Sequence, residues 1–108
     1  MTIVHIVTYE YGSYDECRDG VLAIYATEEL AQAHVIGALE YHDKVIVPLI
    51  KAMHETPARV DRKKYNEGWD AIDKAVADNP WHRMVPTDDP ESYRVGSFSQ
   101  EVLEKLPA

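Results

Sequence analysis

The sequence has a single cysteine, Cys17, so it can form no internal disulfide and no thiolate metal cluster. It also lacks any apolar run near the roughly 20 residues that a bilayer-spanning helix needs. Its longest apolar stretch, residues 45–50, is short and is interrupted by Pro48. The first eleven residues do not have the pattern of a secretion signal. We therefore expect a cytoplasmic protein with no membrane-spanning segment.

Positive charge is scarce as well. Eleven Lys and Arg residues against nineteen Asp and Glu residues give a formal net charge of -8 at pH 7. A field of this sign repels nucleic-acid phosphates and anionic membranes, so direct nucleic-acid binding is not expected. The one basic cluster lies in residues 59–64, and we interpret it as a solvated helix face or half of a self-association contact.

What is present is an ordinary globular mixture, 45% apolar and 28% charged. Residues 2–11 and 21–26 are rich in β-branched and aromatic side chains, and the turn-forming segment 12–20 links them. This pattern predicts two antiparallel strands. The first half of the first strand is apolar on both of its faces, which is typical of a central strand. Thr27, followed by two glutamates, predicts the start of a helix that runs to about residue 42.

Two further helices are expected in the middle of the chain. Residues 46–53 carry apolar side chains at helical spacing. Pro48 either opens this helix or kinks a longer one that starts at Thr27, and we favour a break within residues 42–47. A third helix is expected over residues 57–78.

The chain then predicts a loop over residues 86–92 and a closing strand over residues 93–99, with a bulge or a close contact at Gly96. The result is one α+β domain, residues 1–108, with a small antiparallel sheet of about three strands covered by helices, in the order β-β-α-α-α-β. Residues 2–42 would form a β-β-α core and residues 43–85 a mainly helical insertion before the last strand.

Several short segments share their plan with a known group of proteins: residues 4–7 (VHIV), 9–11 (YEY) and 20–25 (GVLAIY), the helix start at Thr27, and the aromatic strand from Tyr93. In these segments the chain resembles small phage and prophage domains of uncharacterised function. It departs from them in residues 43–85, where the family usually has a short connection. The resemblance carries over no catalytic residue. It implies a phage-type accessory protein, a class that includes inhibitors of host machinery.

Five histidines raise the question of a metal or catalytic site. His5, His34, His42, His54 and His82 lack the spacing typical of zinc ligands, so we expect no metal and no cofactor. We expect His34 at the edge of a helix face, His5 within a strand, and the others at surface or boundary positions. Carboxylates on both sides of Cys17 argue against a nucleophilic thiolate. A small enzyme that uses His34 or His82 with a nearby carboxylate stays open as an alternative.

The most suggestive feature is a mixture of tyrosines and carboxylates at the end of the first strand. Tyrosine offers a large contact area, and clustered carboxylates complement a basic surface. A second acidic stretch precedes the closing strand and would lie at the same end of the sheet if that strand pairs with the first. We therefore predict a protein-binding surface with these residues: Tyr9, Glu10, Tyr11, Tyr14, Asp15, Glu16, Asp19, Asp88, Asp89 and Glu91.

The sequence thus favours a small acidic phage-type accessory protein, and not an enzyme. It would bind a host or phage protein through acidic, tyrosine-bearing loops and so inhibit a nucleic-acid-binding or defence protein. Two alternatives stay open. Tyr9 and Tyr11 could pack in the core while the carboxylates serve only solubility. The chain could instead be a homo-oligomeric structural component that buries Trp69, Trp81 or residues 46–53 against a second copy.

Overall fold

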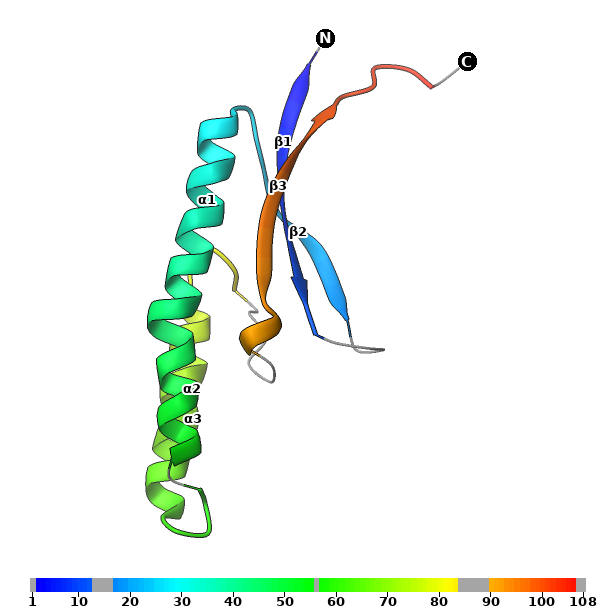
Figure 1. Ribbon diagram of the computed structural model, residues 1–108. Coiled ribbons are helices and arrows are strands. Elements are labelled where there is room, and N and C mark those ends of the chain that lie inside the picture. Colours follow the sequence, from blue (N-terminus) through cyan, green and yellow to red (C-terminus); the bar gives the residue numbers. More distant parts are fainter. Residues whose placement is uncertain (1, 13–16, 56, 84–89, 107–108) are drawn as a thin grey trace.

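Figure 1 shows the computed structural model of the chain, which describes residues 2–12, 17–55, 57–83 and 90–106. Three antiparallel strands form one sheet in the order β2-β1-β3. They are β1 (Ile3–Tyr11), β2 (Arg18–Tyr25) and β3 (Arg94–Glu101). The helices lie on one side of the sheet, so the predicted small α+β fold with about three antiparallel strands is confirmed.

The central strand β1 pairs with β3 in unbroken register, from Ile3 opposite Glu101 to Glu10 opposite Arg94. The one register shift lies between Val7 and Thr8 in the pairing with β2. The bulge or close contact expected at Gly96 is therefore wrong, because a Cβ placed there would meet no heavy atom within 4 Å. A glycine in a strand indicates that an irregularity is tolerated there. Here the irregularity lies in the pairing of β1 with β2, whereas Gly96 lies in β3.

Helix α1 (Glu28–Tyr41) begins as predicted, with the Thr27 hydroxyl accepting a hydrogen bond from the Leu30 amide at 3.3 Å. Its buried residues are Ala31, His34 and Ala38, which recur at spacings of three and four. This stripe lies against all three strands, because α1 contacts β1, β2 and β3.

The break favoured within residues 42–47 is wrong. A π-helical segment, η2 (His42–Ile46), joins α1 directly to α2 (Val47–Glu55), so one continuous helix runs past Pro48. The Val47 amide donates to the His42 carbonyl, five residues back. This wider turn accommodates a proline that in a regular α-helix has no amide to donate and whose ring clashes with the carbonyl four residues before it.

Helix α3 (Arg62–Ala77) starts later than predicted, because residues 57–61 form a turn in which the Val60 and Asp61 amides both donate to the Pro57 carbonyl. Asp61 caps the helix and accepts from the Lys64 amide at 3.0 Å. The helix ends at the predicted position, just before Asn79. A short 3-10 turn, η3 (Pro90–Ser92), leads into β3.

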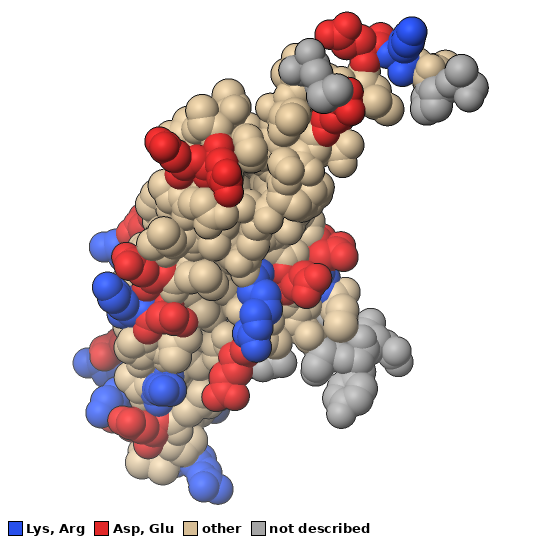
Figure 2. All heavy atoms as spheres, turned by 45° about the horizontal axis from the view of Figure 1, so that its top comes forward, with Lys and Arg blue, Asp and Glu red and all other residues tan. Residues whose placement is uncertain are grey.

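Helix α3 packs on α2 and η2 beyond the edge of the sheet, and η2, α2 and α3 together form a helical arm. The arm and the sheet share one hydrophobic cluster, whose buried members are Ile46, Ile50, Met53, Ile72, Ala75 and Tyr93. Figure 2 shows charges of both signs interspersed along the arm. No helix of the described residues is long and apolar enough to cross a bilayer.

The arm makes the molecule elongated, with extents of 64 × 29 × 17 Å. The radius of gyration is 17.5 Å, compared with about 13 Å for a compact chain of this length.

Candidate functional site

The pairing of β1 with β3 brings two distant acidic segments to one end of the sheet. Glu10 lies opposite Asp19 of β2 on one side and opposite Arg94 of β3 on the other. The Gly12 amide donates to the Ser92 hydroxyl at 2.9 Å, which ties the end of β1 to the turn that carries Glu91. We call one group of exposed carboxylates the acidic end of the sheet: Glu10, Asp19 and Glu91.

Two of these carboxylates stand in an unfavourable arrangement. Glu10 and Asp19 are direct cross-strand partners, and like charges in that position destabilise a sheet. Arg94 lies opposite Glu10 on the other side and offsets part of this negative charge, while its guanidinium also donates to the backbone carbonyls of Glu91 at 2.8 Å and Tyr93 at 3.0 Å. The acidic end therefore combines two neighbouring carboxylates with one guanidinium.

The two described tyrosines of the predicted surface face the interior. The Tyr11 side chain is 5% exposed, and the half-buried Tyr9 ring lies over Gly20, with its Cε1 2.9 Å from where a glycine Cβ would stand. Both residues share the face of β1 that carries buried Val7, because side chains alternate along a strand. The other predicted residues Tyr14, Asp15, Glu16, Asp88 and Asp89 lie outside the described residues.

Beneath the acidic end lies a buried layer of aromatic and imidazole rings. The Tyr9 ring is 4.4 Å from the His82 ring, and the His42 ring is 4.4 Å from the Tyr93 ring. The Tyr93 hydroxyl also contacts His82 Nδ1 at 2.9 Å. We call these four residues, Tyr9, His42, His82 and Tyr93, the histidine-tyrosine layer. It fixes the ends of β1 and β3 on the helices.

The expectation that His42 and His82 lie at surface or boundary positions is wrong, because they are 2% and 8% exposed. His42 continues the sheet-facing stripe of α1, four residues after Ala38, since the helix does not break. His82 is turned inward by Asn79, whose side-chain oxygen accepts from the amides of Trp81 at 2.9 Å and His82 at 3.2 Å.

The hydrogen bonds of His42 and His34 show which ring nitrogen donates to a backbone carbonyl. His42 Nε2 lies 2.7 Å from the Pro90 carbonyl, which can only accept, so Nε2 is the donor. His34 Nε2 likewise donates to the Trp81 carbonyl at 2.9 Å, and its Nδ1 lies 2.8 Å from the Tyr25 hydroxyl. His42 Nδ1 is buried and has no partner among the described residues.

Burial also changes the acidity of the layer. It lowers the pKa of His82 below its usual 6.5, and the nearby rings of His34 and His42 lower it further. Burial raises the pKa of Tyr93 well above its usual 10.0, with a smaller contribution from Tyr9. Both groups are therefore uncharged at neutral pH, as expected of a layer that serves packing.

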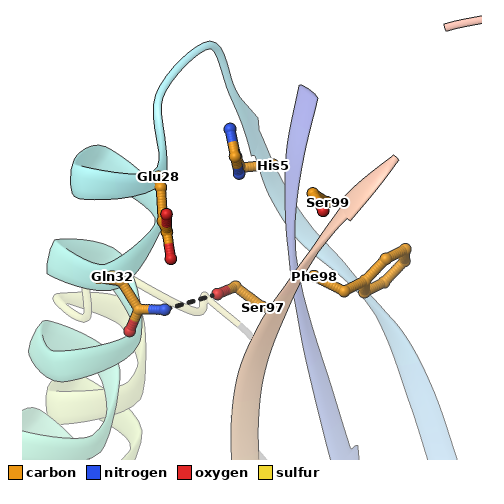
Figure 3. A pocket seen from close by; sticks show the side chains of 6 residues that line it. All are labelled: His5, Glu28, Gln32, Ser97, Phe98 and Ser99. Carbon is orange, nitrogen blue, oxygen red and sulfur yellow. Dashed lines mark hydrogen bonds between the residues drawn. The ribbon is translucent and has the colours of Figure 1, made fainter. Parts of the chain in front are cut away.

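An open polar groove lies at the other end of α1 (Figure 3), with a volume of about 400 Å³. It is lined by His5, Glu28, Gln32, Ser97, Phe98 and Ser99. Gln32 donates to the Ser97 hydroxyl at 3.2 Å, and the Phe98 ring points away from the groove. Most of these side chains are exposed to water, which screens the charges and hydrogen bonds that catalysis would use.

Among the described residues, the hydrogen bonds of His34 and of His82 Nδ1 are with groups other than carboxylates. The ring nitrogens of His34 contact a tyrosine hydroxyl and a backbone carbonyl, and His82 Nδ1 contacts the Tyr93 hydroxyl. No group of three or more His, Cys, Asp or Glu side chains in this part of the chain could hold a metal ion. Of the arrangements described, the acidic end has the most distinct chemistry, an array of anionic acceptors on a rigid support.

In comparisons with known proteins, no protein-family model, no curated protein and no solved structure matches the chain.

Proposed function

We propose that this chain is a small binding protein that docks on a basic surface of a protein partner through the acidic end of its sheet. The observation that carries the proposal is the pairing of Glu10 with Asp19, beside the turn that holds Glu91. Like charges held side by side reduce the stability of the free protein, and a cationic surface would relieve that repulsion on binding.

The rigid support below the acidic end favours binding further. His42 donates to the Pro90 carbonyl and Arg94 donates to the Glu91 carbonyl, so the turn is held from both sides. A surface that is already ordered loses less conformational entropy when a partner binds.

The net charge of -8 suits the same class of partner, because it accelerates association with a basic surface. Surfaces that bind nucleic acid are typically strongly basic. The proposed role is therefore that of an accessory protein that occupies such a surface, which agrees with the phage-type class that the sequence resemblance implies.

The test is a triple charge reversal, Glu10→Lys, Asp19→Lys and Glu91→Lys. The reversed pair keeps like charges opposite each other between β1 and β2, and Glu10→Lys also puts a like charge opposite Arg94 of β3, so the stability of the variant is measured beside its binding. The matched control, Glu29→Lys, Glu40→Lys and Asp73→Lys, makes the same change in net charge at exposed positions on α1 and α3.

Proteins captured from extracts of the native cell by the tagged wild-type chain would be identified, and their affinities for each variant measured at two salt concentrations. We expect the control to lose only the general charge effect and the acidic-end variant to lose binding at least about tenfold more, which is about 1.4 kcal/mol. Equal affinities of the two folded variants would refute the proposal.

A further inference from the structure

The face of the sheet opposite α1 is apolar. Ile6 of β1 lies opposite Ile24 of β2 on one side and opposite Phe98 of β3 on the other, so a row of three large side chains crosses the sheet. Ile24 is 61% exposed and Phe98 is 50% exposed. Val4 and Val21 extend the row along the strands, and we call these five residues the outer face.

No described helix covers the outer face, because α1 and the helical arm lie on the other side (Figure 1). An antiparallel sheet with one face in water normally alternates apolar and polar residues. Here four of the five residues from Ile3 to Val7 are apolar and fall on both faces of β1, with His5 as the exception, a composition close to that of a strand buried on both sides. The helices bury only one face of β1. The other face, whose composition also indicates burial, has no described element packed against it.

The total exposed surface points the same way. The chain exposes 7924 Å², whereas a compact monomer of 12.3 kDa exposes about 6,100 Å². A standard protein interface removes about 800 Å² from each partner. The surplus includes the surface of the elongated helical arm, and it exceeds the area that one interface of that size removes, so the open surface is large enough for a partner.

We propose that a second copy of this chain covers the outer face, in a two-fold dimer that packs sheet on sheet with Ile6 near its centre. Interfaces of homodimers are more apolar than those of transient complexes, and the central row carries only hydrocarbon side chains. A two-fold contact also needs a patch that complements itself, and a row of similar apolar side chains, Ile24, Ile6 and Phe98, can pack against its own copy.

Charge selects the orientation. The carboxylates of Glu10 and Asp19 lie at one end of the outer face, and two such ends would repel each other if they met. A two-fold axis that runs across the strands places them at opposite ends of the dimer. The acidic end of each copy then stays open, so this inference does not depend on the proposed function.

The test measures the mass of the full-length chain in solution by sedimentation equilibrium over a range of concentrations. We expect twice 12.3 kDa for the wild type and 12.3 kDa for the double variant Ile24→Lys and Phe98→Lys. Both side chains are already exposed in one copy, so that variant should keep its circular dichroism spectrum. The control, Leu30→Lys and Ile36→Lys, changes similarly exposed residues of α1 and should stay dimeric.

A second measurement decides the matter if the lysine variant fails to fold. Ile6→Cys in a Cys17→Ser background should form an interchain disulfide on mild oxidation, and Ile36→Cys in the same background should not. A monomeric wild type, a dimer that survives the outer-face substitutions, or a dimer that the α1 control disrupts would overturn the proposal. The charge-reversed acidic-end variant should keep the dimer mass, so loss of partner binding is distinguished from loss of the dimer.

Discussion

The Trp81 indole packs directly on the backbone of α1 at Gly37. A Cβ added at Gly37 would stand 2.4 Å from Cε2 and from Cζ2 of the indole, too close for any side chain. The same tryptophan accepts a hydrogen bond through its carbonyl from His34, one turn earlier on α1. The absence of a side chain at Gly37 therefore allows the segment that follows α3 to lie against α1, which places His82 in the interior.

Gly37→Ala should destabilise the protein. Alanine gains about 1 kcal/mol over glycine in a helix interior. Overpacking against the indole costs about 1–3 kcal/mol, and displacing Trp81 sacrifices a hydrogen bond worth about 1 kcal/mol. The net loss in the free energy of unfolding should be about 1–3 kcal/mol, measured by urea denaturation. Gly96→Ala is the control, because nothing lies within 4 Å of its added Cβ. A Gly37→Ala variant as stable as the wild type would contradict this packing.

Stability should fall when the pH is lowered below about 6.5, because the pKa of His82 is lowered in the folded state. Below pH 6.5 the unfolded chain binds a proton on His82 that the folded chain does not bind. Proton binding therefore lowers the free energy of the unfolded state relative to that of the folded state. Well above 6.5, by about one pH unit or more, His82 is neutral in both states and contributes almost no slope. Urea midpoints measured from pH 7.5 to 5 should show the decline, and His82→Asn should make it shallower. An identical slope in the variant would show that His82 is not the group responsible.

Tyr93 should produce the opposite slope at high pH. Its pKa is raised in the folded state, so above pH 10 the unfolded chain loses a proton that the folded chain retains, and stability decreases as the pH rises. Tyr93→Phe should abolish this slope and cost about 1 kcal/mol at neutral pH through the lost contact with His82. Phenolate absorbance offers a direct check. Up to pH 11 the folded wild type and the variant should gain the same absorbance, since Tyr93 adds nothing until the chain unfolds.

Local chemistry made the start of the fold predictable from sequence. The Thr27 cap depends on residues within one turn, and the strands β1 and β2 depend on alternation along a few residues. The continuous helix through Pro48 was not predictable in the same way. A π-helical segment satisfies the proline only because η2 packs Ile46 into the shared core, and no local signal reports that packing.

The candidate site was predictable in part. The acidic segments were evident in the sequence, and their convergence followed once the closing strand was taken to pair with the first, as it does. The alternation of β1 also placed Tyr9 and Tyr11 on the same face as Val7, which turned out to be the buried face. The burial of His42 and His82 was missed, although His42 continues the spacing of Ala31, His34 and Ala38. That spacing was a usable signal, but imidazoles are rarely expected in a core.

The unbroken helix from Glu28 to Glu55 belongs to both halves of the molecule, since its first part packs on the sheet and its last part packs on α3. If either the sheet half or the arm half unfolds, the other half loses the helix that it packs against. Despite its stretched outline, the protein should therefore melt as a single cooperative unit. A force applied at the acidic end would also reach the far tip of the arm along one rod, with no hinge to absorb it.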